Sequence, residues 1–366
     1  MRAAYFLLSG LYHGRPLDRG VIEALLSAGY DVDVYAPRLP EGDDVYPGSV
    51  RCFEVHYRMK WFRGNLNPWK WRRYSLFLGT CDIPMAFVGV LSAMTGRKSV
   101  TVCDEVYTGG YQGQSRYYWG PLTKRGMRRS AMTVITDEAR IDLQRSYAGL
   151  PKAHRFIQLP CAFVGSRYQF DAPHWKRVIG ADNNDCVLAL SGETSCETGA
   201  HWALAALDGL STRYKLLMQP GGSVDMLTDV LLRRLARQGN VLYVPNRNAS
   251  FIEAMSVNLA ADIGLVFYLS PKPQFQQMGV SSNKLCMYLQ MGKPVIASRQ
   301  KSFSFLEEWG AGVMIDSHEE LPAAVKKIEE DYDRYSKAAL DCFREYINPA
   351  DRLERLKEAF VGLSLR

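Results

Sequence analysis

The sequence has few histidines, no closely spaced cysteines and no long apolar run. Its 6 histidines form no pair at metal-ligand spacing, and its 8 cysteines lie scattered through apolar stretches without a C-x-x-C motif. Scattered thiols of this kind are typical of reduced core residues, so we expect neither disulfides nor a structural zinc site. The longest apolar run, Ile83 to Met94, is shorter than the roughly 20 residues that cross a bilayer.

No secretory signal peptide is recognisable at the amino end. Met1 and Arg2 lead directly into a short apolar run that stops at Ser9 and Gly10, without the cleavage pattern of such a signal. Together with the reduced thiols, this pattern predicts a cytoplasmic protein. If the chain meets a membrane, we expect it to lie on the inner face as a peripheral protein.

The composition is that of a globular protein with room for two domains. The chain has 366 residues, of which 47% are hydrophobic and 23% charged, and this length exceeds what one core ordinarily uses. The formal charge of +7 is uneven, because residues 1–170 hold 23 Lys and Arg against 14 Asp and Glu, while the remainder holds 22 against 24. The positive field therefore belongs to the N-terminal half and indicates an anionic surface or substrate there.

The first residues follow the pattern of one βαβ unit. Ala3 to Leu8 is an apolar strand, a loop with Gly10 and His13 follows, and a helix ending at Gly29 leads into a strand at Val32 to Tyr35. Such a loop opens at the carboxyl ends of parallel strands, where ligands bind. The loop lacks G-x-G-x-x-G, which argues against a nicotinamide cofactor.

Acidic residues flank two predicted strands. Asp104 and Glu105 leave the carboxyl end of the strand Val100 to Cys103, where they are well placed to reach a ligand; alternatively, Asp104 caps a helix. Asp31 and Asp33 imitate a D-x-D metal motif, but they begin a strand directly after a helix stop, which favours a structural role. We therefore expect no metal site.

The pattern restarts after a link at residues 160–185 that contains prolines and a run of Asp and Asn. Strands are predicted from Cys186, Tyr214, Val241 and Ile263, each followed by a helix, and Gly192 lies in the loop after the first of them. Two βαβ-repeating halves predict an α/β fold of two facing Rossmann-like, doubly wound parallel-sheet domains. We place the first domain at residues 1–165 and the second at 166–344, with a final helix at about 345–366 packing back on the first.

The most informative stretch is SSNKLCMYLQMGKPVIAS, residues 281–298. It predicts a helix that opens on Ser281, Ser282 and Asn283, ends at Gly292 and leads into a short apolar strand. A helix start offers unpaired backbone N–H groups and the positive end of the helix dipole, which bind phosphates. Lys284 lies in this first turn, where a cation is mildly unfavourable and hints at an anion nearby; the alternative is that it points into solvent.

The stretch from Tyr57 to Arg73 has the most unusual composition. Three tryptophans, a phenylalanine and a tyrosine are interleaved with lysines and arginines, and no acid occurs. Such a mixture is typical of segments at the headgroups of anionic lipid. One alternative is a loop that packs its rings on the core and exposes its charges. The other is a nucleic-acid surface, for which spaced stacking aromatics on a sheet or a recognition helix are lacking.

Several stretches resemble the two-domain GT-B glycosyltransferases, in particular the large retaining group usually numbered family 4. RSAMTVITDEARIDLQ in the first half, and VLALSG, KLLMQPGG, ADIGLVFY and SSNKLCMYLQMGKPVIAS in the second, are similar to segments of that group and occur in its order. The resemblance spans nearly the whole chain. It implies a nucleotide-sugar donor held mainly by the second domain, an acceptor held by the first, and transfer without a metal or cofactor.

The resemblance also implies a pair of glutamates that this sequence does not have. By position they fall on Gly279 and Met287, and the cations expected after the strand at 186–190 are replaced by residues that include Glu193 and Glu197. The expected donor contacts are Gly10, Gly192, Arg247, Gln277, Ser281, Ser282, Asn283 and Lys284.

The predicted function is that of a metal-independent, retaining hexosyltransferase in bacterial-type surface polysaccharide or glycan assembly, with a glycan or polyprenyl-linked acceptor. The resemblance implies that the donor phosphate takes the acceptor proton; if a protein base is needed, Asp104, Glu105 and His13 are the candidates. Nucleic acid is not an expected partner. The alternative is a diverged, non-catalytic GT-B protein that binds a glycan or another transferase. An epimerase would need more cleft carboxylates and histidines.

Overall fold

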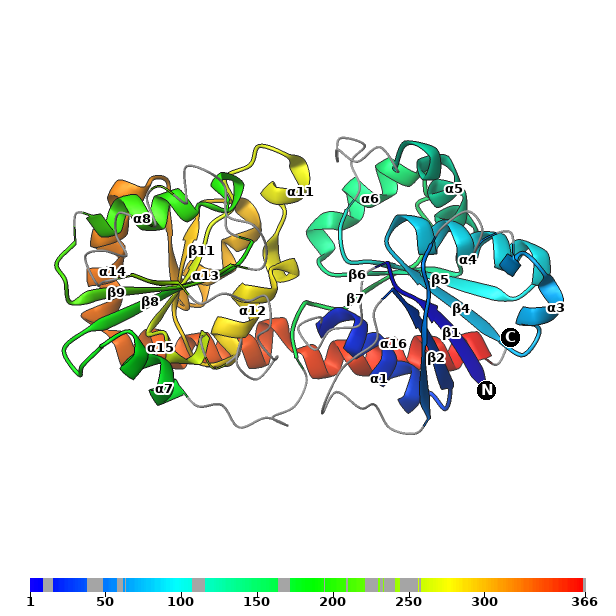
Figure 1. Ribbon diagram of the computed structural model, residues 1–366, viewed down its shortest axis with the longest axis horizontal. Coiled ribbons are helices and arrows are strands. Elements are labelled where there is room, and N and C mark those ends of the chain that lie inside the picture. Colours follow the sequence, from blue (N-terminus) through cyan, green and yellow to red (C-terminus); the bar gives the residue numbers. More distant parts are fainter. Residues whose placement is uncertain are drawn as a thin grey trace. The chain divides into compact units, whose positions relative to one another are not determined.

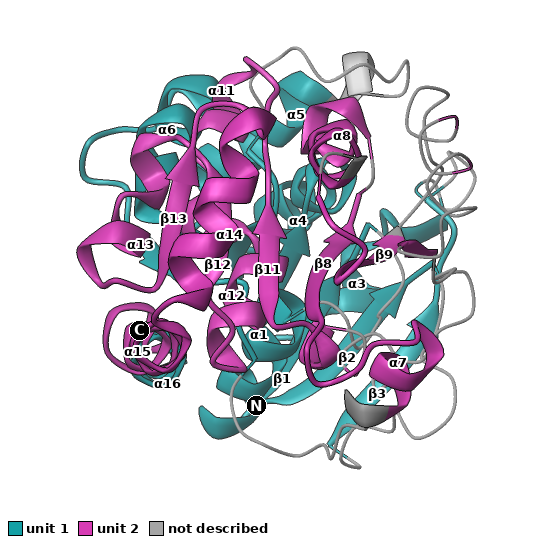
Figure 2. Ribbon diagram, turned by 90° about the vertical axis from the view of Figure 1, so that its left-hand side faces the viewer, with its two compact units in different colours: residues 1–163, 349–366 teal, residues 164–348 magenta. Residues whose placement is uncertain are grey.

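The computed structural model describes residues 1–8, 16–37, 49–57, 62, 64–106, 116–163, 172–193, 195–208, 210–220, 230, 233, 241–243, 256 and 258–364. The chain forms two compact units, one of residues 1–163 with 349–366 and one of residues 164–348. Each unit is a layered α/β structure with helices packed on a parallel sheet (Figure 1). Figure 2 colours the two units separately.

The sheet of the first unit has the order β3-β2-β1-β4-β5-β6-β7 among the described residues, and all its pairings are parallel. The order reverses between β1 and β4, so the carboxyl ends of these strands form a topological switch point, where ligands bind in such sheets. The strands are β1 (Arg2–Phe6), β2 (Asp31–Ala36), β3 (Val50–Glu54), β4 (Leu76–Thr80), β5 (Lys98–Cys103), β6 (Met132–Ile135) and β7 (Phe156–Gln158).

Helices cover both faces of this first sheet. On one face, α1 (Pro16–Ser27) packs beside the C-terminal helix α16 (Pro349–Ser364), and fully buried Phe360 joins the core there (Figure 1). The other face is covered by helices whose large apolar side chains form two further clusters. These are α3 (Pro68–Trp71), α4 (Asp82–Thr95), α5 (Arg116–Arg129) and α6 (Ile141–Ala148), which the turn η1 (Glu138–Arg140) precedes.

The second unit repeats this organisation. Its described strands have the order β10-β9-β8-β11-β12-β13 and are all parallel, with the switch point between β8 and β11. They are β8 (Cys186–Gly192), β9 (Tyr214–Pro220), β10 (Val241–Tyr243), β11 (Ile263–Val266), β12 (Val295–Ser298) and β13 (Gly312–Ile315). The helices and turns are α7 (Ala172–Val178), η2 (Cys196–Thr198), α8 (Ala200–Asp208), α11 (Pro273–Gln276), η3 (Gly279–Ser281), α12 (Asn283–Gln290), η4 (Lys301–Phe303), α13 (Phe305–Glu308), η5 (His318–Glu320), α14 (Leu321–Glu329), α15 (Tyr332–Asp341) and η6 (Cys342–Ile347).

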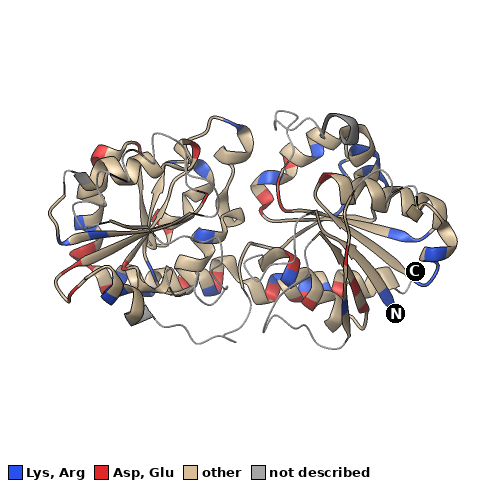
Figure 3. Ribbon diagram, viewed as in Figure 1, with Lys and Arg blue, Asp and Glu red and all other residues tan. Residues whose placement is uncertain are grey.

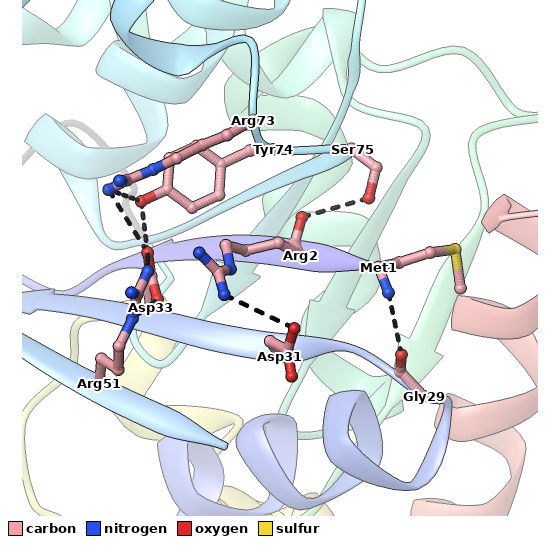
Figure 4. A network of polar contacts seen from close by, with 9 residues as sticks. All are labelled: Met1, Arg2, Gly29, Asp31, Asp33, Arg51, Arg73, Tyr74 and Ser75. Atoms are coloured by element: carbon pink, nitrogen blue, oxygen red, sulfur yellow. Dashed lines mark hydrogen bonds and ion pairs between the residues drawn. The ribbon is translucent and has the colours of Figure 1, made fainter. Parts of the chain in front are cut away.

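The D-x-D pair on β2 has the structural role that its context indicates. Asp33 is buried and accepts hydrogen bonds from Arg51 at 2.8 and 2.6 Å and from the Tyr74 hydroxyl at 2.6 Å. Asp31 lies 3.7 Å from Arg2 (Figure 4). Both carboxylates are therefore committed to ion pairs within the first unit.

All eight cysteines are free thiols, and six of them are buried, as their apolar context predicts. Within the described ranges, no three or more His, Cys, Asp or Glu side chains gather where they could hold a metal ion. The same part of the chain has no helix that is both long and apolar enough to cross a bilayer.

Candidate functional site

The candidate site lies at the switch-point edge of the second unit. Ser191 and Gly192 end β8, and Phe267 and Tyr268 follow β11, so these residues meet at the carboxyl edge of the sheet. Gly192 has a φ of 90°, a left-handed conformation that glycine adopts without strain. The chain then returns to this edge at α12, because the Tyr268 and Ser282 hydroxyls lie 2.9 Å apart.

The start of α12 is held in place by several polar contacts. Ser282, fully buried, is the N-cap, and its hydroxyl accepts a hydrogen bond from the Leu285 backbone N–H at 3.4 Å. The preceding turn is fixed by the Gly279 N–H, which donates to the Ser302 hydroxyl at 3.2 Å. Ser281 and Asn283 lie on either side of Ser282 at this start. The sequence prediction of a helix beginning at this stretch is therefore confirmed.

Lys284 lies in the first turn of α12 and is only 6% exposed. Its Nζ has no hydrogen-bond acceptor among the described residues and lies 4.9 Å from the centroid of the Tyr268 ring. Burial lowers the pKa of this ammonium group to about 8, although the charge of Glu193 acts to raise it. The alternative in which Lys284 points into solvent is wrong. A buried cation in this position is suited to an anionic ligand.

The acids that replace the expected cations after β8 differ in their surroundings. Glu197 forms an ion pair with Lys272 at 2.7 Å and accepts a hydrogen bond from the Ser270 hydroxyl at 3.3 Å. Glu193 is exposed, and only the Ser195 hydroxyl reaches its carboxylate, at 3.5 Å, among the contacts of the described residues. Glu193 is therefore accessible for accepting hydrogen bonds from hydroxyl groups beside Lys284.

Tyr288 fixes α12 against the sheet. Its hydroxyl donates to the Ala189 carbonyl of β8 at 3.0 Å, and its ring lies so close to Gly264 of β11 that a Cβ there would stand 2.3 Å from a ring carbon. Burial raises the pKa of this phenol above its usual range, so it stays protonated and able to donate. Met287, beside Tyr288, is 8% exposed and supplies no carboxylate where the resemblance places one.

The remaining predicted donor residues are only partly described. Gln277 is the C-cap residue of α11 and is separated from η3 by Met278, in the segment that leads into α12. Its neighbour Gln276 donates to the Ser270 carbonyl at 2.8 Å. Gly10, His13 and Arg247 lie outside the described residues, so the structure does not place them.

The switch-point edge of the first unit carries Asp104 and Glu105. Both follow β5, and Arg140, which is 1% exposed, joins them: its Nη1 donates to the Asp104 carbonyl at 3.4 Å and lies 3.9 Å from the Glu105 carboxylate. Arg140 was not predicted as a site residue, because an arginine in the first turn of a polar helix is usually a solvent-exposed charge. The structure thus places a buried cation beside the two candidate acids.

A second polar group lies at the same edge. The Tyr5 hydroxyl donates to Asp18 at 2.6 Å and lies 2.7 Å from the Thr80 hydroxyl, which is itself 3.2 Å from Asp18. Burial, followed by the charge of Asp18, holds the pKa of Tyr5 well above its usual value. The protonated phenol therefore anchors the first turn of α1 to the ends of β1 and β4.

The second unit also has an open pocket of about 650 Å³ at the opposite edge of its sheet. Its carboxylates are occupied: Asp262 pairs with Lys176 at 2.7 Å and accepts from the Val187 N–H at 2.8 Å, and Glu329 pairs with Arg213 at 2.6 Å. This pocket lies at the amino ends of β8 and β11, away from the switch-point edge. We assign it a structural role in joining these strands to α7 and α14.

One family profile matches a part of the chain. The family profile described as "Glucosyltransferase 3-like, C-terminal domain" matches residues 243–350, which is less than half of the chain. No curated protein matches the sequence significantly.

Solved structures match the whole chain at low sequence identity. Anabaena HepE in complex with UDP-glucose has a TM-score of 0.70 and 14% identity, and the match covers 98% of this chain and 99% of that chain. WaaG, a glycosyltransferase involved in lipopolysaccharide biosynthesis, has a TM-score of 0.69 and 17% identity, with 98% and 99% covered. Sucrose-phosphate synthase from Thermosynechococcus elongatus has a TM-score of 0.65 and 15% identity, with 100% and 97% covered. The protein therefore has the GT-B fold.

Proposed function

We propose that this protein is a glycosyltransferase that binds a nucleotide sugar at the start of α12 and transfers the sugar to a glycan or a lipid-linked acceptor. The observation that carries the proposal is Lys284, a buried ammonium group with no hydrogen-bond acceptor among the described residues, at a helix start on the switch-point edge. A buried charge without a partner costs folding free energy, and a diphosphate would supply the missing partner. The likeness to HepE, which binds UDP-glucose, supports this donor class.

The proposed mechanism relies on electrostatic stabilisation of the leaving nucleotide diphosphate. The backbone N–H groups at the start of α12 and the Lys284 ammonium group take up the negative charge that develops on the phosphate, without a metal ion. We propose a retaining reaction in which the donor phosphate receives the acceptor proton. Asp104 and Glu105, held by Arg140, are the proposed acceptor contacts and the candidates for a general base if one is used.

We place the acceptor in surface polysaccharide or glycan assembly, carried on a polyprenyl lipid at the inner membrane face. The likeness to WaaG, which is involved in lipopolysaccharide biosynthesis, supports this assignment. The basic, tryptophan-containing stretch Tyr57 to Arg73 supports contact with the membrane, because interleaved cations and rings favour the headgroup region.

Thermal unfolding with UDP, GDP, CMP and ADP tests the donor part of the proposal. A ligand that binds only the folded protein raises its melting temperature by mass action. We expect one nucleoside diphosphate to raise the melting temperature of the wild-type protein and to have a much smaller effect on Lys284→Met. Equal melting temperatures with and without each of the four nucleotides would contradict donor binding.

A second candidate function is a non-catalytic GT-B protein that binds a glycan or another transferase. It is favoured by Gly279 and Met287, which stand where the resemblance places glutamates, and by Glu193 and Glu197 in place of cations. Fold alone does not decide between the two functions. A soluble glycan that raises the melting temperature, with no effect of any nucleotide, is the result that the second function predicts.

A further inference from the structure

The first unit displays an exposed tryptophan on a short turn, which we call the Trp69 turn (residues 64–73). Trp69 is 66% exposed, the highest fraction among the large apolar side chains of the described residues, and Leu66 is 43% exposed. Leu66 precedes α3 and Trp69 belongs to it, and α3 lies beside α4 in the first unit (Figure 1). An exposed indole ring with cations beside it is a combination that is favoured at membrane interfaces.

The Trp69 turn is rigid because its neighbouring residues are buried. Trp71 is 1% exposed, its ring centroid lies 5.5 Å from that of Phe6 and 5.9 Å from that of Phe87, and its Nε1 donates to the Asn65 carbonyl at 2.7 Å. The Asn67 side chain caps α3 by accepting from the Trp69 N–H at 3.0 Å. Trp69 is therefore held outward by the same turn that holds Trp71 in the core.

The carboxyl end of the turn is also fixed. Arg73 donates to the Tyr74 hydroxyl at 2.7 Å, and that hydroxyl donates to buried Asp33 at 2.6 Å, as the dashed lines in Figure 4 mark. Arg51 completes the network from β3. A preformed turn loses little conformational entropy when it binds a partner, which favours association.

The charge of the turn is wholly positive. Residues 64–73 contain three cations, Lys70, Arg72 and Arg73, and no acid, and α3 in Figure 3 carries blue and no red. The Arg72 guanidinium lies 3.2 Å from the centroid of the Trp69 ring. The Lys70 Nζ donates to the Asn65 side-chain oxygen at 2.6 Å. The turn thus presents an apolar ring with cations around it.

We propose that the Trp69 turn docks on an anionic lipid bilayer. Leu66 and Trp69 enter the headgroup region, while Arg72 and Lys70 lie against lipid phosphates, an arrangement that suits the amphipathic indole ring and the complementary charge. Phe62 and Trp71, in contrast, belong to the core, so the packed-loop interpretation is correct for that part of the stretch. The proposal deepens the proposed function, because a lipid-linked acceptor requires an enzyme at the membrane.

Co-sedimentation of the full chain with lipid vesicles tests the proposal without any transfer reaction. The vesicles are phosphatidylcholine alone or phosphatidylcholine mixed with phosphatidylglycerol, at low and high salt. The variants are Trp69→Ala and Arg72→Ala, and the matched controls in the second unit are Val178→Ala, an exposed apolar residue, and Lys326→Ala, an exposed cation. Circular dichroism and the melting temperature confirm that each variant is folded.

We expect the wild-type protein to bind the anionic vesicles, more weakly at high salt and on neutral vesicles. Removing Arg72 should weaken binding about fivefold, because each cation near an anionic surface contributes on the order of 1 kcal/mol. Trp69→Ala should weaken binding by about tenfold, since it removes both the ring and the support of Arg72. The controls should bind as the wild type does.

The proposal would be overturned if folded Trp69→Ala bound anionic vesicles as strongly as the wild-type protein does. It would also be overturned if the wild-type protein bound no anionic vesicles. The second result would leave the Trp69 turn as a contact for another macromolecule, such as a protein. Both results are independent of nucleotide binding, so they would not affect the proposed donor site. Loss of nucleotide-induced stabilisation with vesicle binding intact would instead contradict the proposed function alone.

Discussion

Lys284 is a single residue that folding alone disfavours. It is 6% exposed at the positive end of α12, where the helix dipole and the loss of hydration both oppose its charge. The ring of Tyr268 at 4.9 Å offers partial compensation through a cation–π contact. A residue that costs stability is commonly retained for function, and the function that we propose for Lys284 is the binding of an anion.

Replacing Lys284 should stabilise the free protein. Its folded pKa of about 8 lies below the ordinary value of 10.5, and each unit of difference corresponds to about 1.4 kcal/mol. Lys284→Met should therefore raise the free energy of unfolding by about 3 kcal/mol at neutral pH, as measured by urea denaturation. Lys326→Met is the matched control, because Lys326 is 76% exposed. A lower unfolding free energy for Lys284→Met would contradict the proposed environment.

The same stabilisation should depend on pH in a defined direction. Because the folded pKa lies below the unfolded one, the unfolded chain binds the extra proton between about pH 8 and 10.5, and wild-type stability gains from rising pH in that window. The difference between Lys284→Met and the wild-type protein should be constant below pH 8 and shrink above it. Urea denaturation across this pH range measures this difference in the free energy of unfolding. A difference that grows with pH would be inconsistent with a buried, charged Lys284.

At this scale, part of the candidate site could be predicted from the sequence. Lys284 and Ser282 were predicted because a helix start is readable from local composition, and Asp104 and Glu105 because they follow a strand. Arg140 and Tyr288 were not, since their importance comes from partners distant in sequence, such as Ala189 for the Tyr288 hydroxyl. Partner choice of this kind depends on tertiary packing, which a local pattern does not contain.

At the scale of elements, the packing of α12 on β11 positions the start of the helix. Gly264 allows the Tyr288 ring to lie directly on the strand, and a Cβ at this position would stand within 2.3 to 2.8 Å of three ring atoms. Tyr288 then reaches the Ala189 carbonyl on β8 at 3.0 Å. The absence of a side chain at Gly264 therefore allows α12 to pack closely on the sheet beside the switch point.

Gly264→Val should displace Tyr288 and lower the free energy of unfolding by about 1–3 kcal/mol, the usual cost of overpacking a core. Because α12 moves with the ring, nucleotide-induced stabilisation should fall as well. Gly362→Ala on α16 is the matched control: a Cβ there meets nothing within 4 Å, so better helix propensity should leave stability unchanged or raise it by up to about 1 kcal/mol. Equal urea midpoints for Gly264→Val and the wild type would refute this packing.

The elements themselves were predicted unevenly. The predicted strand Val100 to Cys103 ends where β5 ends, and Cys186, Tyr214, Val241 and Ile263 begin strands as expected. The edge strand β3 was not predicted, because its residues are only partly buried and lack a clear apolar pattern. In Tyr57 to Arg73, composition could not separate core rings from exposed ones, because burial of Trp71 depends on Phe6 and Phe87.

At the scale of the whole molecule, the chain builds each GT-B unit with its own core. The C-terminal helix α16 belongs to the core of the first unit, where Leu356, Ala359 and Phe360 are buried and Lys98 donates to the Leu363 carbonyl at 2.7 Å. The fold class could be predicted from the sequence because repeated strand–helix pairs allow few topologies. The prediction that the C-terminal helix packs on the first unit rested on its amphipathic pattern alone.

Phe360→Ala should destabilise the first unit. Removing a fully buried phenylalanine costs about 3–5 kcal/mol, and Phe360 is fully buried in the core with α1. In the native protein at low temperature, nucleotide affinity should be unchanged, because the proposed donor residues that the structure describes are all in the second unit. Urea denaturation and calorimetry measure the two effects. A large loss of nucleotide affinity in folded Phe360→Ala would place donor contacts outside the second unit.

Isothermal titration calorimetry of a nucleoside diphosphate with the wild-type protein and Lys284→Met measures whether Lys284 binds the donor phosphates. A hydrogen bond to a charged group contributes about 1.5–3 kcal/mol, so we expect the folded variant to bind between about tenfold and a hundredfold more weakly. We also expect wild-type affinity to fall as the pH rises above 8, where free Lys284 loses its proton. Equal affinity of the two proteins at neutral pH would show that Lys284 does not bind the diphosphate.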